Sequence, residues 1–180
     1  WKPYRPSGQN KEYASQVLAN GLPIRMDTSC QFWKHGRLAL KRLHPELHEL
    51  LPQEAYGKGH FIEYNIFHPE ARKIYKRYWE AALDMYQDEL NRPPIDVELF
   101  NEPSYDDPSP YNRELFAKYL EEKYESVDAM NRLWRTEYPS FEEASQFRQR
   151  TDHAGLYVDW GKFMEKGMTD INRFGRAVVK

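Results

Sequence analysis

The chain has 180 residues, enough for one domain of ordinary size, and its composition is 40% hydrophobic, 30% charged and 15% aromatic. A net charge of −2, and the lack of any apolar run near the ~20 residues of a membrane-spanning helix, argue against nucleic acid and membrane as partners. The single cysteine, Cys30, excludes an intrachain disulfide, and the histidines match no zinc-binding spacing, so no metal or cofactor is predicted.

The N-terminal part of the chain is predicted to contain one helix and one strand. Residues 1–10 read as a linker or loop without the apolar core of a signal peptide. Because no initiating Met is present, we expect a mature form or a piece of a longer protein. A short helix over residues 11–19 ends at Asn20-Gly21, a common stop signal. The segment LPIRMDTS (22–29) then alternates apolar and polar residues, as a half-buried strand does.

A long irregular connection follows, and after it comes the clearest helix. Residues 30–67 have no strand pattern, and only residues 45–51 have a helical one. A connection of this length inside a compact domain is more often functional than idle. Pro69 stands at the first position of the next helix, whose apolar residues keep helical spacing to about Leu90. The Pro-Pro pair at 93–94 prevents its continuation.

From residue 95 onward the sequence alternates strand and helix and then becomes helical. Residues 95–101 read as a strand and residues 112–124 as a helix, which indicates βα units and a parallel sheet. A short helix at 127–134, a capping box starting at Ser140 and a long amphipathic helix follow. The apolar residues of that last helix are Val158, Phe163, Met164, Met168, Ile171, Phe174 and Val178. Two parallel strands cannot form a self-sufficient sheet, so the chain is expected to be incomplete.

The segment IDVELFNEP (95–103) combines a strand pattern with carboxylates. If the residues alternate strictly, its apolar residues up to Leu99 face one side, and its acidic residues and Phe100 face the other. A closed barrel accounts for this pattern, because one row then faces the surrounding helices and the mixed row faces the interior. Arg25 is a candidate partner for the inward carboxylates. Glu102 would stand at the carboxyl end of its strand, where barrel enzymes place catalytic groups, and Pro103 stops the strand pairing.

The tetrapeptide FNEP (100–103) after an apolar strand resembles the acid/base motif on the fourth strand of clan A glycoside hydrolases, which are (β/α)8 barrels. Further along the chain GLPIRMDTS, HPELHELLP, YNIFHPEARKIY and FNEPSY follow the order of the corresponding elements in the family 42 β-galactosidases. The stretch LFAKYLEEKYESVDAMNRLWRTEYPSFEE (115–143) is similar to that family's helix ending in Lys-Tyr and to the next short helix with Asn and Trp. The resemblance covers residues 15–147.

This resemblance implies a fold, a reaction and site residues. The α/β chain, residues 1–180, would be a fragment of a (β/α)8 TIM-barrel catalytic domain that carries barrel strands three and four. The reaction would be hydrolysis of β-glycosidic bonds with retention, with Glu102 as acid/base and Asn101 bound to the sugar 2-hydroxyl. The nucleophile, a second Glu after strand seven, and the remainder of the barrel are expected outside this chain. The isolated chain is therefore expected to be inactive, and to associate with that remainder or with copies of itself.

Other polar and aromatic residues have competing interpretations. Trp33 and Tyr105 follow the two strand ends and are candidates to stack on sugar rings, whereas Trp134 lies in an amphipathic helix and is predicted to be core. Asp106 and Asp107 are expected to form a solvated acidic loop rather than a calcium site.

The chain departs from the family pattern at three places. Phe61 and Ile62 replace an arginine-rich stretch implicated in sugar binding, Asn65 replaces a cysteine that often serves a structural zinc, and PSY follows Glu102 where the galactosidases usually have YG. The oligo- or polysaccharide substrate, endo or exo action, and cellular compartment therefore stay open. Two other functions also stay open: a catalytically inactive carbohydrate-binding barrel relative, and a small α/β interaction domain, which would need additional strands within residues 1–67.

Overall fold

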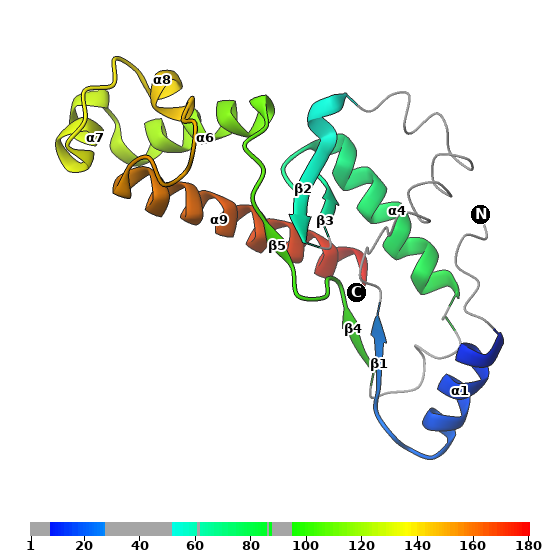
Figure 1. Cartoon of the computed structure of the whole chain (residues 1–180). Helices are drawn as coiled ribbons and strands as arrows, with labels where there is room; N and C mark the ends of the chain where they lie inside the picture. Colours follow the sequence, from blue (N-terminus) through cyan, green and yellow to red (C-terminus); the bar gives the residue numbers. More distant parts are fainter. Residues whose placement is uncertain (1–7, 28–51, 61, 86, 88–94) are drawn as a thin grey trace. The chain divides into compact units, whose positions relative to one another are not determined.

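The computed structural model describes residues 8–27, 52–60, 62–85, 87 and 95–180 (Figure 1). The chain divides into two compact units, Trp1–Tyr105 with Ile171–Lys180, and Asp106–Asp170. Its elements are α1 (Gly8–Ala19), β1 (Ile24–Asp27), the 3₁₀ turn η1 (Gln53–Ala55), β2 (Tyr56–His60), β3 (Ile62–Tyr64), α4 (Pro69–Met85), β4 (Ile95–Glu98), β5 (Ser104–Tyr105), α6 (Pro110–Tyr124), α7 (Val127–Trp134), α8 (Phe141–Ser145) and α9 (Ala154–Val178). None of the helices in the described ranges is both long and apolar enough to cross a membrane.

Strands β1 and β4 form the parallel pair that the sequence predicts (Figure 1). Their register places Ile24 opposite Ile95 and Asp27 opposite Glu98. Strand β4 ends at Glu98 rather than at Asn101, because the chain bends at the next residue. The proposed partner Arg25 does reach Glu98, with Nη1 and Oε2 3.9 Å apart. Since 70% of the Arg25 side chain is exposed, this pair adds little stability.

A second, antiparallel sheet with the order β3-β2-β5 was not predicted. The expectation that residues 30–67 are irregular is therefore wrong for 56–60 and 62–64, while the helical piece at 45–51 lies outside the described residues. Two glycines allow the backbone of β2 to lie close to its neighbours β3 and β5. A Cβ on Gly57 would lie 2.7 Å from the Tyr64 backbone, and one on Gly59 would collide with the Ser104 carbonyl. Glycine in a strand marks this kind of close backbone approach.

Helix α4 provides the core of the first unit, along the apolar stripe that its sequence predicts. The buried residues of this helix are Ala71, Ile74, Tyr75, Tyr78 and Trp79. At its start the imidazole Nδ1 of His68 accepts a hydrogen bond from the N–H of Glu70 at 3.2 Å, which satisfies one donor of the first turn. Burial lowers the pKa of His68 despite the opposing carboxylates of Glu70 and Glu54, and so favours the neutral imidazole that can accept this bond.

The second unit consists of α6, α7, α8 and residues 154–170 of α9. The predicted capping site is confirmed, because the Ser140 hydroxyl accepts from the N–H of Glu143 at 3.2 Å. The predicted long helix is confirmed as α9, although Val158 is 50% exposed and does not belong to its buried face. Trp160 is buried there instead, with its ring 5.0 Å from that of Phe116 in a T-shaped contact.

Candidate active site

Asn101 and Glu102 lie in the short loop between β4 and β5, where the chain bends. Glu102 is exposed and has a φ of +41°, in the left-handed region that residues with a Cβ rarely adopt. Asn101 is half-buried. Because the strand stops at Glu98, this turn, rather than strand alternation, sets the direction of the Glu102 side chain. Non-glycine residues in left-handed backbone are found disproportionately at active sites and ligand clamps.

Phe100, the residue before Asn101, is buried against α4. Its ring makes T-shaped contacts with Tyr75 at 5.8 Å and with Trp79 at 5.7 Å between centroids. The sequence pattern placed Phe100 on the same row as the carboxylates, and this is wrong. The bend at Leu99 ends the alternation, so Phe100 turns toward the helix instead.

Tyr105 closes the other side of the loop. It is 7% exposed, and its ring lies close to Gly57 and Gly59 and 6.2 Å from the ring of Phe67. Its proposed contact with a sugar stays a prediction, and in this chain little of its surface is available for stacking. Trp33, the other proposed stacking residue, lies outside the described residues, as does everything else between 28 and 51.

Asn65, which stands where the family resemblance implies a structural zinc ligand, serves as a hydrogen-bond bridge. Its side chain is fully buried; Nδ2 donates to the Glu54 carbonyl at 2.8 Å and Oδ1 accepts from the Phe67 N–H at 2.9 Å. An amide used in this way cannot replace a thiolate, and no group of three His, Cys, Asp or Glu in the described ranges could hold a metal ion. The residues at Asn65 therefore do not fit a zinc site.

The second unit contains a buried polar network that the sequence did not reveal. Asp159 is 1% exposed and accepts hydrogen bonds from Lys123, from the Tyr124 hydroxyl at 2.6 Å and from the Trp134 indole at 3.2 Å. Burial opposes the charge on Lys123, but its hydrogen bonds to Asp159 and Tyr124 prevail and raise its pKa. Burial raises the pKa of Tyr124, and its hydrogen bond to Asp159 adds to that effect. Trp134 is core, as predicted, at 3% exposure.

The acidic pair at 106–107 is only partly the solvated loop that was expected, because Asp106 is exposed whereas Asp107 is buried. The Asp106 carboxylate accepts from the Trp160 indole at 2.7 Å and pairs with Arg150 at 3.0 Å. Asp107 is fully buried beside Asn112, whose amide donates to its carbonyl at 2.8 Å. These contacts tie the start of the second unit to its helices.

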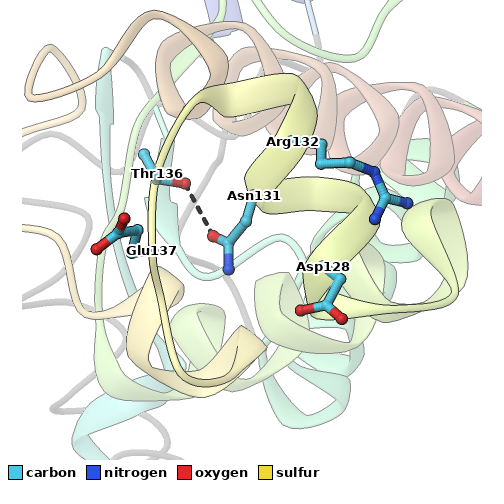
Figure 2. Close-up of a pocket in the computed structure, with 5 residues that line it drawn as sticks. All are labelled: Asp128, Asn131, Arg132, Thr136 and Glu137. Atoms are coloured by element: carbon cyan, nitrogen blue, oxygen red, sulfur yellow. Dashed lines mark hydrogen bonds between the residues drawn. The ribbon is translucent and has the colours of Figure 1, made fainter.

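A pocket of about 430 Å³ also lies within the second unit (Figure 2). The residues that line it are Asp128, Asn131, Arg132, Thr136 and Glu137. Figure 2 shows the Thr136 hydroxyl directed at the Asn131 amide, to which it donates at 2.9 Å. Asn131 also donates to the Tyr138 carbonyl at 2.8 Å and accepts from the Tyr138 N–H at 3.0 Å. The Asn131 amide therefore stabilises the turn after α7. Glu102 is not among the residues that line this pocket.

Comparison with known proteins gives one family match and several structural ones. Residues 40–180 match the model of glycoside hydrolase family 42, described as β-galactosidase. The fold is similar to that of the β-galactosidase from Bacillus circulans sp. alkalophilus, with a TM-score of 0.65 and 16% sequence identity, over 96% of this chain and 27% of that one. It is also similar to an exo-β-agarase, with a TM-score of 0.56 and 13% identity, over 99% of this chain and 28% of that one. Comparison with curated proteins gives no match.

The identities to both solved structures are low, so these two similarities concern the fold. This chain spans only 27% and 28% of those proteins.

Proposed function

This chain belongs to glycoside hydrolase family 42, and on that premise we propose that the full-length protein is a retaining glycosidase that cleaves β-glycosidic bonds. The family match over residues 40–180 carries this proposal, since it includes Asn101-Glu102 shortly after the parallel strand β4. A β-galactoside is the first candidate substrate, given the family's description, and the similarity to an exo-β-agarase keeps longer carbohydrates open. In this proposal β1 and β4 are strands three and four of a (β/α)8 barrel that the rest of the protein completes.

Glu102 is proposed to act first as an acid and then as a base. As the glycosidic bond breaks, its carboxylic acid donates a proton to the leaving oxygen, while a second carboxylate attacks the anomeric carbon. Water then attacks the anomeric carbon while the Glu102 carboxylate takes a proton from that water. The bond between the sugar and the second carboxylate breaks, and the sugar is released. The Asn101 amide is proposed to bind the sugar 2-hydroxyl, through a hydrogen bond that strengthens in the transition state.

The exposure of Glu102 sets a requirement on the rest of the protein. A general acid must hold its proton near neutral pH, which burial or a neighbouring carboxylate favours. Because Glu102 is exposed in this chain, the remaining barrel and the bound substrate must cover it. The second carboxylate must come from the remaining barrel too.

Two alternatives can be compared with this proposal. A catalytically inactive carbohydrate-binding relative is distinguished by the full-length sequence, since a second Glu that ends an apolar strand further along supports the enzyme. A small α/β interaction domain requires additional strands within residues 1–67, and β2 and β3 meet that condition. The family match over 40–180 nevertheless favours the glycosidase.

Kinetics of Glu102→Ala in the full-length protein test the proposal. Loss of a general acid typically costs ~10²–10⁴-fold, and we expect that loss on alkyl glycosides but much less on aryl glycosides with good leaving groups. Azide should partly restore turnover of the activated substrate. Glu125→Ala is the matched control, because Glu125 is also an exposed glutamate with a positive φ, 62°, and it lies at the end of α6. Unchanged activity of Glu102→Ala on alkyl glycosides would refute the assignment.

A further inference from the structure

Buried aromatic rings hold both ends of the loop that carries Asn101 and Glu102. Phe100 and Tyr105 are each 7% exposed, whereas Glu102, Pro103 and Ser104 between them are exposed. Tyr105 is fixed because its strand, β5, pairs with β2. In this pairing Tyr105 lies opposite Gly59. The loop therefore has two fixed ends, one on α4 and one on β2.

The anchor of Phe100 is itself tightly constrained. Tyr75 and Trp79 are fully buried and stack with centroids 5.8 Å apart and an interplanar angle of 24°. The Tyr75 hydroxyl donates to the Tyr64 carbonyl at 2.7 Å and accepts from the Tyr64 N–H at 3.2 Å, so this ring is tied to β3. Trp79 also meets the ring of Phe174 at 6.1 Å. Because close-packed rings shift only together, Phe100 has little freedom.

A free loop would relax the unfavourable backbone of Glu102, which has a φ of +41°. We propose that Phe100, packed edge-on against both Tyr75 and Trp79, is a positioning residue that keeps Asn101 and Glu102 in their catalytic geometry. This inference rests on the proposed acid/base role of Glu102. Phe100 does not touch the substrate; it fixes the backbone that carries the two residues that do.

Phe100→Leu in the full-length protein tests this role, with Phe116→Leu as the matched control. Phe116 is fully buried among the rings of Tyr119, Trp160 and Phe163, but it lies in the second unit. Both substitutions replace a buried ring with a smaller apolar side chain, so both should lose stability through the space left behind. For each variant, Tm and the kcat and KM values for an alkyl and an activated aryl glycoside are measured, with Glu102→Ala in the same series.

We expect Phe100→Leu to lower kcat on the alkyl glycoside about tenfold or more through misplacement of the acid, with little change in KM or in turnover of the activated substrate. Phe116→Leu should lower Tm comparably but leave the alkyl-to-aryl ratio of rates unchanged. An unchanged ratio in Phe100→Leu, or the same change in Phe116→Leu, would overturn the positioning role. If Glu102→Ala shows no dependence on the leaving group, the proposed function itself fails, and this inference fails with it.

Discussion

Replacing Glu102 with glycine should give a more stable protein than replacing it with alanine, which reverses the usual order of these two residues. At a φ of +41° the Cβ crowds the backbone, at a cost of about 1–2 kcal/mol. Glycine avoids that cost. However, glycine gives the unfolded chain more conformational freedom, which lowers the free energy of unfolding by about 0.4–1 kcal/mol. Taken at the middle of both ranges, the difference leaves the glycine variant more stable by roughly 0.8 kcal/mol.

Two other glutamates serve as controls for this comparison of glycine with alanine. Glu125 has a φ of 62° at the end of α6, so its glycine variant should also be more stable than its alanine variant. Glu122 is exposed inside α6, where glycine should be less stable than alanine by about 1 kcal/mol. Free energies of unfolding in urea for the three alanine and glycine pairs, in the full-length protein, give the comparison directly.

The test is whether the glycine variant at position 102 has a higher free energy of unfolding than the alanine variant. Alanine as stable as glycine there, together with a clear glycine preference at Glu125, would mean that Glu102 lacks a left-handed backbone. The strain that the two aromatic anchors are inferred to hold would then be absent. If Glu102→Gly is more stable than the alanine variant, as at Glu125, the left-handed backbone at position 102 costs stability whenever a Cβ is present.

The remaining predictions concern the Asp159 network and the isolated chain. Lys123 and Tyr124 have raised pKa values in the folded protein, so the stability they contribute is present below about pH 10 and is lost as the pH rises further. Asp159→Asn should reduce that alkaline loss and lower the free energy of unfolding by about 1–3 kcal/mol, as measured in urea. The 180-residue chain alone should not hydrolyse aryl β-glycosides, because retention needs two carboxyl groups about 5–5.5 Å apart; turnover by a monomer in a sizing experiment would contradict this.

The helices could be predicted because their signals are local. Pro69 at the first position of α4, and the Ser140 cap before α8, each act within one turn of the chain. The apolar stripe of α4 repeats at helical spacing whatever it packs against, and its residues Ala71, Ile74, Tyr75 and Tyr78 are buried. The parallel pairing of β1 with β4 followed from the helices between strand patterns.

Strand β2 could not be predicted, because its sequence YGKGH has no apolar alternation and contains two glycines. Those glycines are explained only by the neighbouring strands, because the Tyr64 backbone and the Ser104 carbonyl occupy the space that a side chain would need. The buried Asp159 was missed for a similar reason. Its three hydrogen-bond donors come from α6 and α7, and the sequence of α9 alone does not indicate that these donors lie near Asp159.

The free energies around Glu102 explain why the chain retains a strained loop there. Full burial of an aromatic side chain such as Phe100 contributes about 1.5–3 kcal/mol, and Tyr105 adds a similar amount on the other side. The left-handed backbone of Glu102 costs only about 1–2 kcal/mol, so the two anchors can hold it. The exposed side chains of Glu102 and Pro103 bury little surface in return. The loop is thus stabilised from its ends and strained at its centre, as expected of a segment that holds a carboxylate in position.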